Sequence, residues 1–169
     1  MLIKCVMIEL TNNCNLDCMY CYNSRGSVNS WNFSDLIKTC NSFKKMGINK
    51  FIFSGGEPFL YNNINQIIEW GIENNLIFSF ISNGIHITVK TISLLSNSHF
   101  SIQISLDTIN RSTYSLIRGE DKLESVLNTI EKVRKSNIPL SISITVNSIT
   151  LKTLPETLKY CADNSFGNI

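Results

Sequence analysis

Apolar segments of strand length alternate with segments of helical periodicity from one end of the chain to the other. Strands are predicted at residues 3–10, 51–54, 77–82, 100–106 and 140–147. Helices are predicted where apolar residues recur at i, i+3, i+4 and i+7, around residues 36–43, 64–72, 88–97, 123–133 and 153–164, the first with Ser34 as its cap. Five βα units in this order predict an α/β fold with a parallel sheet and right-handed crossovers.

Two of the predicted strands have one apolar and one polar face. In the segment FSIQISLD, Ser101, Gln103, Ser105 and Asp107 alternate with apolar residues, and the segment SISITVN repeats the pattern and ends at Asn147. Because helices of βα units cover the apolar face, the polar face looks the other way. A closed eight-stranded barrel fills its interior mostly with bulky branched side chains. We therefore expect an open, curved sheet that holds a ligand; a two-layer sheet whose polar face meets water is the alternative.

Composition and charge narrow the class of protein. The 169 residues are 43% hydrophobic and 17% charged, which predicts one globular domain over residues 1–169. The net charge is +2 with scattered Lys and Arg, so no nucleic-acid partner is expected. The chain has no secretory signal and no apolar run of the roughly 20 residues that span a bilayer, so we expect no membrane and a cytoplasmic location. Thiols stay reduced there, and grouped cysteines more often bind metal than form disulfides.

Three of the six cysteines lie within the segment CNLDCMYC, as Cys14, Cys18 and Cys21. This segment directly follows the first predicted strand, at the edge where parallel α/β sheets carry their sites. Iron–sulfur clusters and structural zinc normally take four protein ligands. The other cysteines, Cys5, Cys40 and Cys161, are predicted to be structural. The incomplete set leaves one metal position open, as catalytic metal sites do.

CNLDCMYC has the CxxxCx(aromatic)C form of the radical S-adenosylmethionine (SAM) enzymes, and the chain resembles that family. The resemblance implies that Cys14, Cys18 and Cys21 bind three irons of a four-iron, four-sulfur cluster, [4Fe-4S]. The fourth iron would be chelated by the amino and carboxylate groups of SAM. Tyr20 would then pack beside the adenine.

A second motif follows the second predicted strand. Gly55-Gly56-Glu57-Pro58 resembles the family's GGEP turn, which receives the methionine amino group of SAM. Paired glycines permit positive φ and close backbone approach. Pro58 is expected to hold Glu57 in an extended conformation, so that strand-end carbonyls and a carboxylate meet a cation.

Two further motifs lie at the ends of the third and fourth predicted strands. Ser82-Asn83-Gly84 resembles the family's TNG turn, and Ser105-Leu106-Asp107 resembles its SLD element. The polar side chains of these elements would face the cofactor. For Ser105 and Asp107, this agrees with the alternation of polar and apolar residues.

The last two candidate residues follow the fourth and fifth strands. Arg118-Gly119 resembles the family's RG element, and Arg118 is implied to pair with the SAM carboxylate. An exposed arginine before a flexible glycine is the alternative. Asn147, at the end of the fifth strand's polar face, is expected to reach ribose hydroxyls.

The family's core is usually a six-unit partial barrel, and five βα units are expected here. The chain ends at FGNI, where the sixth strand would begin. The edge of the fifth strand would otherwise present unpaired backbone groups, so a partner chain or self-association is expected there.

The sequence therefore predicts a radical SAM enzyme or its catalytic core. It would cleave SAM reductively to a 5′-deoxyadenosyl radical that abstracts hydrogen from substrate, with an electron donor such as flavodoxin or ferredoxin. The motif set most resembles the maturases that modify peptides or proteins, and the cyclases of molybdopterin synthesis are the main competitor. Two alternatives from other classes stay open: a zinc-binding scaffold with Cys40 as fourth ligand, and a non-catalytic cluster-binding subunit completed by a partner.

Overall fold

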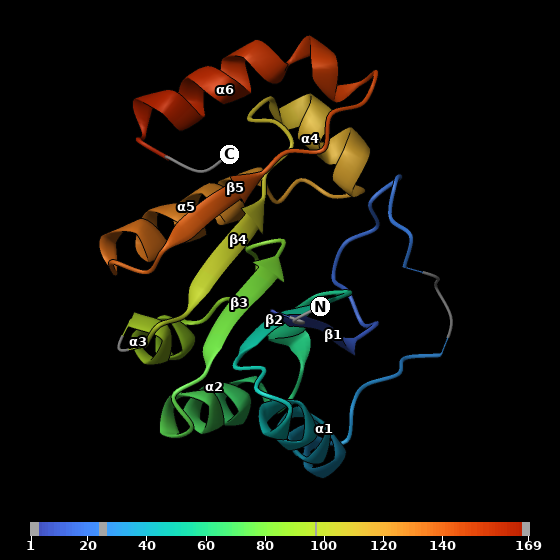
Figure 1. The fold of residues 1–169 in the computed structure, drawn as a ribbon. Coiled ribbons are helices and arrows are strands. Elements are labelled where there is room, and N and C mark those ends of the chain that lie inside the picture. Colours follow the sequence, from blue (N-terminus) through green and yellow to red (C-terminus); the bar gives the residue numbers. More distant parts are fainter. Residues whose placement is uncertain (1–3, 24–26, 97, 167–169) are drawn as a thin grey trace.

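The computed structural model describes residues 4–23, 27–96 and 98–166 and contains a parallel five-stranded sheet (Figure 1). The strand order follows the chain order: β1 (Val6–Thr11), β2 (Lys50–Gly55), β3 (Ile77–Ser82), β4 (Ser101–Ser105) and β5 (Leu140–Ser143). Each strand pairs in parallel with the next. The predicted α/β alternation is therefore confirmed.

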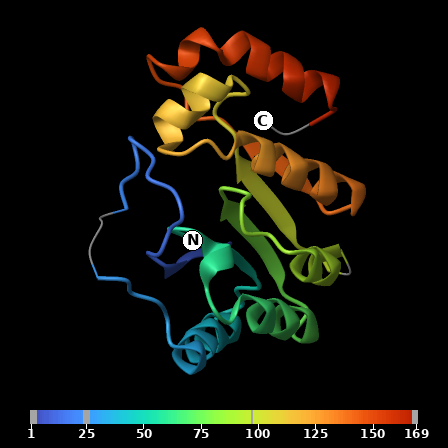
Figure 2. The same cartoon turned by 180° about the vertical axis from the view of Figure 1, so that it is seen from behind.

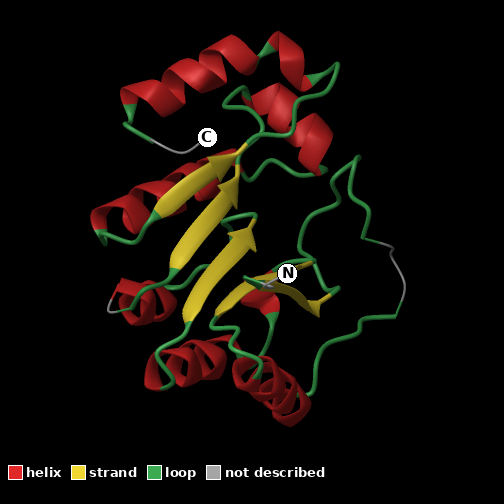
Figure 3. Cartoon of the chain, viewed as in Figure 1, coloured by secondary structure: helices red, strands yellow, loops and turns green. Residues whose placement is uncertain are grey.

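Helices connect the strands: α1 (Phe33–Lys45), α2 (Ile64–Glu73), α3 (Val89–Ser96), α4 (Arg111–Arg118), α5 (Leu123–Lys135) and α6 (Leu154–Asp163), with short 3₁₀ helices η1 (Pro58–Leu60) and η2 (Thr150–Lys152). Consecutive right-handed crossovers return on the same side of a sheet, so α1, α2, α3 and α5 lie along one face, seen from both sides in Figures 1 and 2. The segment of residues 12–23, which follows β1, lies on the side to which the arrowheads of β3, β4 and β5 point (Figure 3). None of the described helices is long and apolar enough to cross a membrane.

The core lies between the sheet and these helices and is rich in phenylalanine. Phe78 is fully buried at the centre, with its ring centroid 4.8 Å from that of Phe53 and 4.6 Å from that of Phe100. In β4, Ile102 and Ile104 are buried, whereas the alternate residues are only half-buried. Strand β4 thus has one packed apolar face and one polar face, whereas the same outer face of β1, β2 and β3 also carries Met7, Ile52, Ile77 and Ile81.

The structure corrects the first predicted helix cap. Asn32, not Ser34, caps α1, because Asn32 Oδ1 accepts hydrogen bonds from the backbone N–H of Ser34 at 2.9 Å and from its hydroxyl at 2.8 Å. Both residue types are good caps, and the sequence offers both within three positions.

Helix α4 was not predicted. It has only eight residues, and its buried apolar side chains are Tyr114 and Ile117, too few for a recognisable period. Asn110 caps its start by accepting from Thr113 N at 3.1 Å, and Gly119 ends it in the left-handed conformation with φ +79°.

Strand β5 ends at Ser143, four residues before its predicted end. Beyond the strand, Thr145 N donates at 2.8 Å to the carboxylate of Asp107. Asn147 Oδ1 accepts from Ile149 N and Thr150 N and forms a turn before η2. Position 3 of the first predicted strand and position 97 of the third predicted helix lie outside the described residues.

Candidate functional site

The cysteine loop, residues 14–21, follows β1 and lies at the carboxyl edge of the sheet. Cys14, Cys18 and Cys21 are free thiols that line one cavity of about 390 Å³. This volume lies within the range of small-molecule and cofactor sites, and the cavity is lined by residues of the segment 12–28 and by Glu120, not by the residues predicted to contact SAM. The first part of the sequence prediction, three cysteines at one site, is thus present in the fold.

The remaining cysteines lie elsewhere. Cys40 and Cys161 are fully buried in the apolar core, as predicted, whereas Cys5 is exposed and precedes β1 instead of lying inside it. Within residues 4–23, 27–96 and 98–166, no three His, Cys, Asp or Glu side chains are grouped to hold a single metal ion. Cys40, the expected fourth ligand of a zinc site, is fully buried on α1 and does not line the cavity of the three cysteines.

The paired glycines of the GGEP turn bring the end of β2 against the backbone that leads into the cysteine loop. Gly56 N donates to Thr11 O at 2.7 Å, and Glu57 N donates to Asn13 O at 2.8 Å. A Cβ on Gly55 would lie 2.2 Å from Thr11 O, and one on Gly56 would lie 2.3 Å from Asn13 O. Gly55 has φ +127°, so the expected positive φ and close backbone approach are both present.

Glu57 is extended before Pro58, as predicted, but its carboxylate is fully buried. Its Oε1 accepts from Phe59 N at 3.1 Å and Ser82 Oγ at 2.8 Å, and its Oε2 accepts from Asn83 N at 2.8 Å. Burial raises the pKa of this carboxyl to about 7, although the three hydrogen bonds favour the charged form. Glu57 thus joins the turns that follow β2 and β3.

Asn83 carries this connection on to the cysteine loop. Its Nδ2 donates to Asn15 Oδ1 at 2.8 Å and lies 3.9 Å from Cys14 Sγ. Burial raises the pKa of the Cys14 thiol, and the contact with Asn83 opposes that rise. The predicted SNG turn therefore contacts the cysteine loop directly.

The carboxyl end of α4 accepts hydrogen bonds from the other side of the cysteine loop. Met19 N donates to Ile117 O at 3.0 Å, and Asp17 N donates to Arg118 O at 3.2 Å. A Cβ on Gly119 would lie 2.9 Å from Asp17 O. This contact between the cysteine loop and α4 was not predicted, because α4 itself was not predicted. The Arg118-Gly119 pair, which ends the helix, was the available signal in the sequence.

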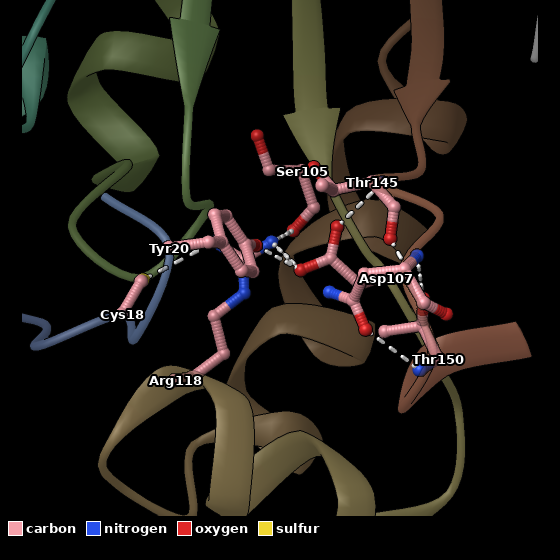
Figure 4. A network of polar contacts seen from close by, with 8 residues as sticks. Cys18, Tyr20, Ser105, Asp107, Arg118, Thr145 and Thr150 are labelled. Carbon is pink, nitrogen blue, oxygen red and sulfur yellow. Dashed lines mark hydrogen bonds and ion pairs between the residues drawn. The ribbon is translucent and has the colours of Figure 1, made fainter. Parts of the chain in front are cut away.

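Arg118 is 5% exposed, so the alternative of an exposed arginine is wrong. Its Nη2 lies 2.6 Å from Asp107 Oδ2 and donates to Ser105 O at 3.2 Å, while its Nη1 lies 3.6 Å from Cys18 Sγ (Figure 4). Its Nε is buried and has no hydrogen-bond partner within the described part of the chain. The site thus contains a fixed guanidinium whose buried Nε N–H group has no partner among the described residues.

Tyr20 extends this network from the cysteine loop. Its hydroxyl donates to Asp107, and its ring centroid lies 5.8 Å from Arg118 Cζ. Burial raises the pKa of Tyr20 well above its ordinary value, so the hydroxyl stays protonated. The other carboxylate oxygen of Asp107 accepts from Thr145 N, so Asp107 connects the cysteine loop to the segment after β5 (Figure 4).

Asn147 lies at the far end of this network. Its backbone N–H donates to Thr150 Oγ1 at 2.8 Å, and Thr150 Oγ1 donates to Thr145 O at 2.9 Å. The side-chain oxygen of Asn147 is used in its own turn. The contact with a ribose therefore stays a prediction, with the side-chain amide N–H group as the donor that it would use.

Known proteins of one superfamily are similar to this chain. The family described as the Radical SAM superfamily matches residues 8–161. A probable GTP 3′,8-cyclase of Methanocaldococcus jannaschii is 31% identical over 167 residues, which are 95% of this chain and 56% of the relative. The sporulation killing factor maturation protein SkfB of Bacillus subtilis is 27% identical over 165 residues, 95% of this chain and 40% of the relative. The chain thus spans about half the length of these relatives.

The fold also matches that of a solved structure. The crystal structure of Streptococcus suis SuiB bound to precursor peptide SuiA superposes with a TM-score of 0.84 and 19% sequence identity, over 96% of this chain and 37% of SuiB. The matched family segment contains the cysteine loop and the motifs that follow β2, β3 and β4. The chain therefore belongs to the radical SAM superfamily.

Proposed function

We propose that this chain is the catalytic core of a radical SAM enzyme in which Cys14, Cys18 and Cys21 bind three irons of the [4Fe-4S] cluster. The observation that carries the proposal is the group of three free thiols on one cavity. Each sulfur has an N–H group within reach: Asn83 Nδ2 for Cys14, Arg118 Nη1 for Cys18 and, at 3.4 Å, Asn23 N for Cys21. Such donors suit thiolates that share the negative charge of a cluster.

When bound, the cluster supplies one electron that cleaves SAM to methionine and the 5′-deoxyadenosyl radical that abstracts hydrogen from substrate. The chain's residues position SAM. The carbonyl groups of Gly55 and Gly56 receive its amino group. Pro58 continues the turn into η1, where its carbonyl accepts from Tyr61 N at 3.1 Å, and Glu57 orients that turn through its bonds to Ser82 and Asn83.

The other SAM contacts come from the polar network. The unused Nε of Arg118 is the donor for the SAM carboxylate, because a buried N–H without a partner is costly until a ligand satisfies it. Tyr20 packs beside the adenine, and Asn147 reaches the ribose hydroxyls. Ser105 and Asp107 hold Arg118 in place.

For the substrate, we favour a peptide or protein over a nucleoside triphosphate. By strand alternation, the face of the sheet away from the packed core carries Met7, Glu9, Lys50, Ile52, Ser54, Ile77, Ser79, Ile81, Ser101, Gln103, Ser105, Ser141 and Ser143. Among these described strand residues the only cation is Lys50, which is the first residue of β2 and thus lies at the edge opposite the cysteines. Phosphate groups are commonly bound by Arg and Lys side chains, whereas hydroxyl and amide groups suit a peptide. SuiB, which shares the fold, was solved with a precursor peptide.

A small redox protein such as flavodoxin or ferredoxin would donate the electron. This assignment follows from the need for a low-potential donor and is part of the proposal, as is a cytoplasmic location, where the three thiols stay reduced. A partner chain or a second copy paired with the edge of β5 is a further expectation.

The test is anaerobic reconstitution of the chain with iron and sulfide, followed by electron paramagnetic resonance (EPR) of the reduced protein with and without SAM. We expect a cluster signal that SAM changes, and formation of 5′-deoxyadenosine under reducing conditions. Replacement of Cys14, Cys18 and Cys21 by Ala should abolish the signal, whereas Cys5→Ala, at an exposed cysteine outside the site, should leave it unchanged. A chain that binds no cluster, or a cluster indifferent to SAM, would contradict the proposal.

A further inference from the structure

The guanidinium of Arg118 is fixed between two parts of the site. One edge, at Nη2, contacts Asp107 Oδ2 at 2.6 Å and Ser105 O at 3.2 Å. The other edge, at Nη1, contacts Cys18 Sγ at 3.6 Å. A planar guanidinium presents its donors in a rigid fork. Because Asp107 and Ser105 O hold Nη2, the rigid fork also fixes the direction of Nη1, which faces the Cys18 sulfur.

The acidic partner is fixed as well. Asp107 is fully buried and accepts from Tyr20 and from Thr145 N in addition to its ion pair with Arg118. Separation of a buried ion pair leaves an uncompensated charge in a medium of low dielectric constant. The pair therefore keeps one orientation, with its positive end toward the Cys18 sulfur and its negative end away from it (Figure 4).

The three cysteines differ in this respect. Cys14 faces the neutral amide of Asn83 at 3.9 Å, and Cys21 accepts from the backbone of Asn23 at 3.4 Å. Only the contact to Cys18 comes from a charged group among these three, and a charge-assisted hydrogen bond is roughly twice as strong as a neutral one. Hydrogen bonds to sulfur and nearby charge set the reduction potential of an iron–sulfur cluster.

We propose that Arg118 is a positioning residue that donates an N–H···S hydrogen bond from Nη1 to the Cys18 sulfur and thereby raises the reduction potential of the bound cluster. Asp107 holds the guanidinium in place and limits the size of the effect, because its negative charge partly offsets the positive one. This inference rests on the proposed function, in which Cys18 is a cluster ligand. It is separate from the contact of Nε with SAM, because it concerns the cluster before SAM binds.

The test is a mediated redox titration of the reconstituted chain without SAM, followed by EPR of the reduced cluster. Arg118→Gln should shift the midpoint potential to a more negative value, because it removes the positive charge and leaves Asp107 unpaired. Asp107→Asn should shift the potential to a more positive value, because it removes the negative charge. Two changes at one ion pair with shifts of opposite sign are the expected signature.

A matched control is available on the same helix. Arg111→Gln removes the same charge from the first residue of α4, where the arginine is exposed and pairs with Asp121. Its potential should equal that of the unmodified chain. Arg118→Lys, which keeps the charge but not the fork, should give a potential between those of Arg118→Gln and the unmodified chain, and it serves if the Gln variant does not fold.

The outcomes separate this inference from the proposed function. Shifts of the same sign in Arg118→Gln and Asp107→Asn would indicate general loosening of the site and would overturn the inference. A loaded cluster whose potential does not move in either variant would overturn it too, while the proposed function would stand. Failure of the unmodified chain to bind a cluster would overturn both.

Discussion

The buried carboxylate of Glu57 accepts a hydrogen bond from the backbone N–H of Asn83 at 2.8 Å, and this bond joins the turn after β2 to the turn after β3. The first turn also contacts the backbone before the cysteine loop, because Glu57 N donates to Asn13 O at 2.8 Å. The second turn contacts the loop itself, because Asn83 Nδ2 donates to Asn15 Oδ1 at 2.8 Å. A carboxylate that contacts none of the three cysteines by a hydrogen bond therefore helps to determine where they lie.

The buried carboxylate predicts a pH-dependent stability. Its pKa is about 7 in the fold against an ordinary value of 4.5, so between these values the folded state binds more protons than the unfolded state. The free energy of unfolding should therefore fall as pH rises from about 4.5 to about 7, by up to about 3 kcal/mol from this group. Glu57→Gln should remove that fall. Urea unfolding of both proteins across this pH range measures it.

The control for this prediction is Glu69→Gln, at an exposed carboxylate on α2. Its pH dependence should match that of the unmodified chain. Equal slopes for Glu57→Gln and the unmodified chain would show that Glu57 does not titrate in this range.

The close contact between the cysteine loop and the end of α4 predicts that one methyl group added at Gly119 strongly lowers the free energy of unfolding. Gly119→Ala should lower the free energy of unfolding by the roughly 1–2 kcal/mol of a left-handed residue. The free energy of unfolding should fall by about 2 kcal/mol more, because the new Cβ would lie 2.9 Å from Asp17 O and the cysteine loop must shift. Urea unfolding and the iron content after reconstitution measure both consequences, and the iron content should fall.

Gly47→Ala is the matched control. Gly47 has φ +85°, close to the φ of +79° at Gly119, but a Cβ there would meet nothing within 4 Å. This variant should show only the cost of the left-handed backbone and keep its iron. Equal losses in the two variants would mean that the contact with Asp17 is not tight.

The hydroxyl of Tyr20 predicts a specific loss of stability. Tyr20→Phe removes a donor from the fully buried carboxylate of Asp107 and should cost about 2 kcal/mol, while the ring remains. Tyr22→Phe is the comparison: Tyr22 is 76% exposed, and its hydroxyl donates to Glu9 at 2.9 Å. Loss of this hydroxyl should cost less than about 0.5 kcal/mol. Thermal unfolding of the two variants compares them directly. A smaller loss in Tyr20→Phe than in Tyr22→Phe would contradict this account of the network.

The sequence alone was sufficient to find all five strands and the position of the cysteine loop. Strand alternation depends only on which residues are apolar, and the motifs occupy fixed places at strand ends. The polar face of β4 and the extended conformation of Glu57 were predictable for the same reason, because each follows from neighbouring residues.

Local pattern did not reveal α4, since an eight-residue helix with two buried apolar side chains has no clear period. The predicted length of β5 was wrong because the chain leaves the sheet after Ser143. There, Thr145 N donates to Asp107, a residue just beyond the end of β4. These features depend on partners that are distant in the sequence.

The sequence by itself determined which chemical groups are present and at which edge of the sheet they gather. Only the tertiary structure decided their partners: Arg118 with Asp107 and Cys18, and Glu57 with Ser82 and Asn83. The physical reason is that a buried charged group must find its partners within the fold. Which partners it meets depends on how separate strand ends come together in space.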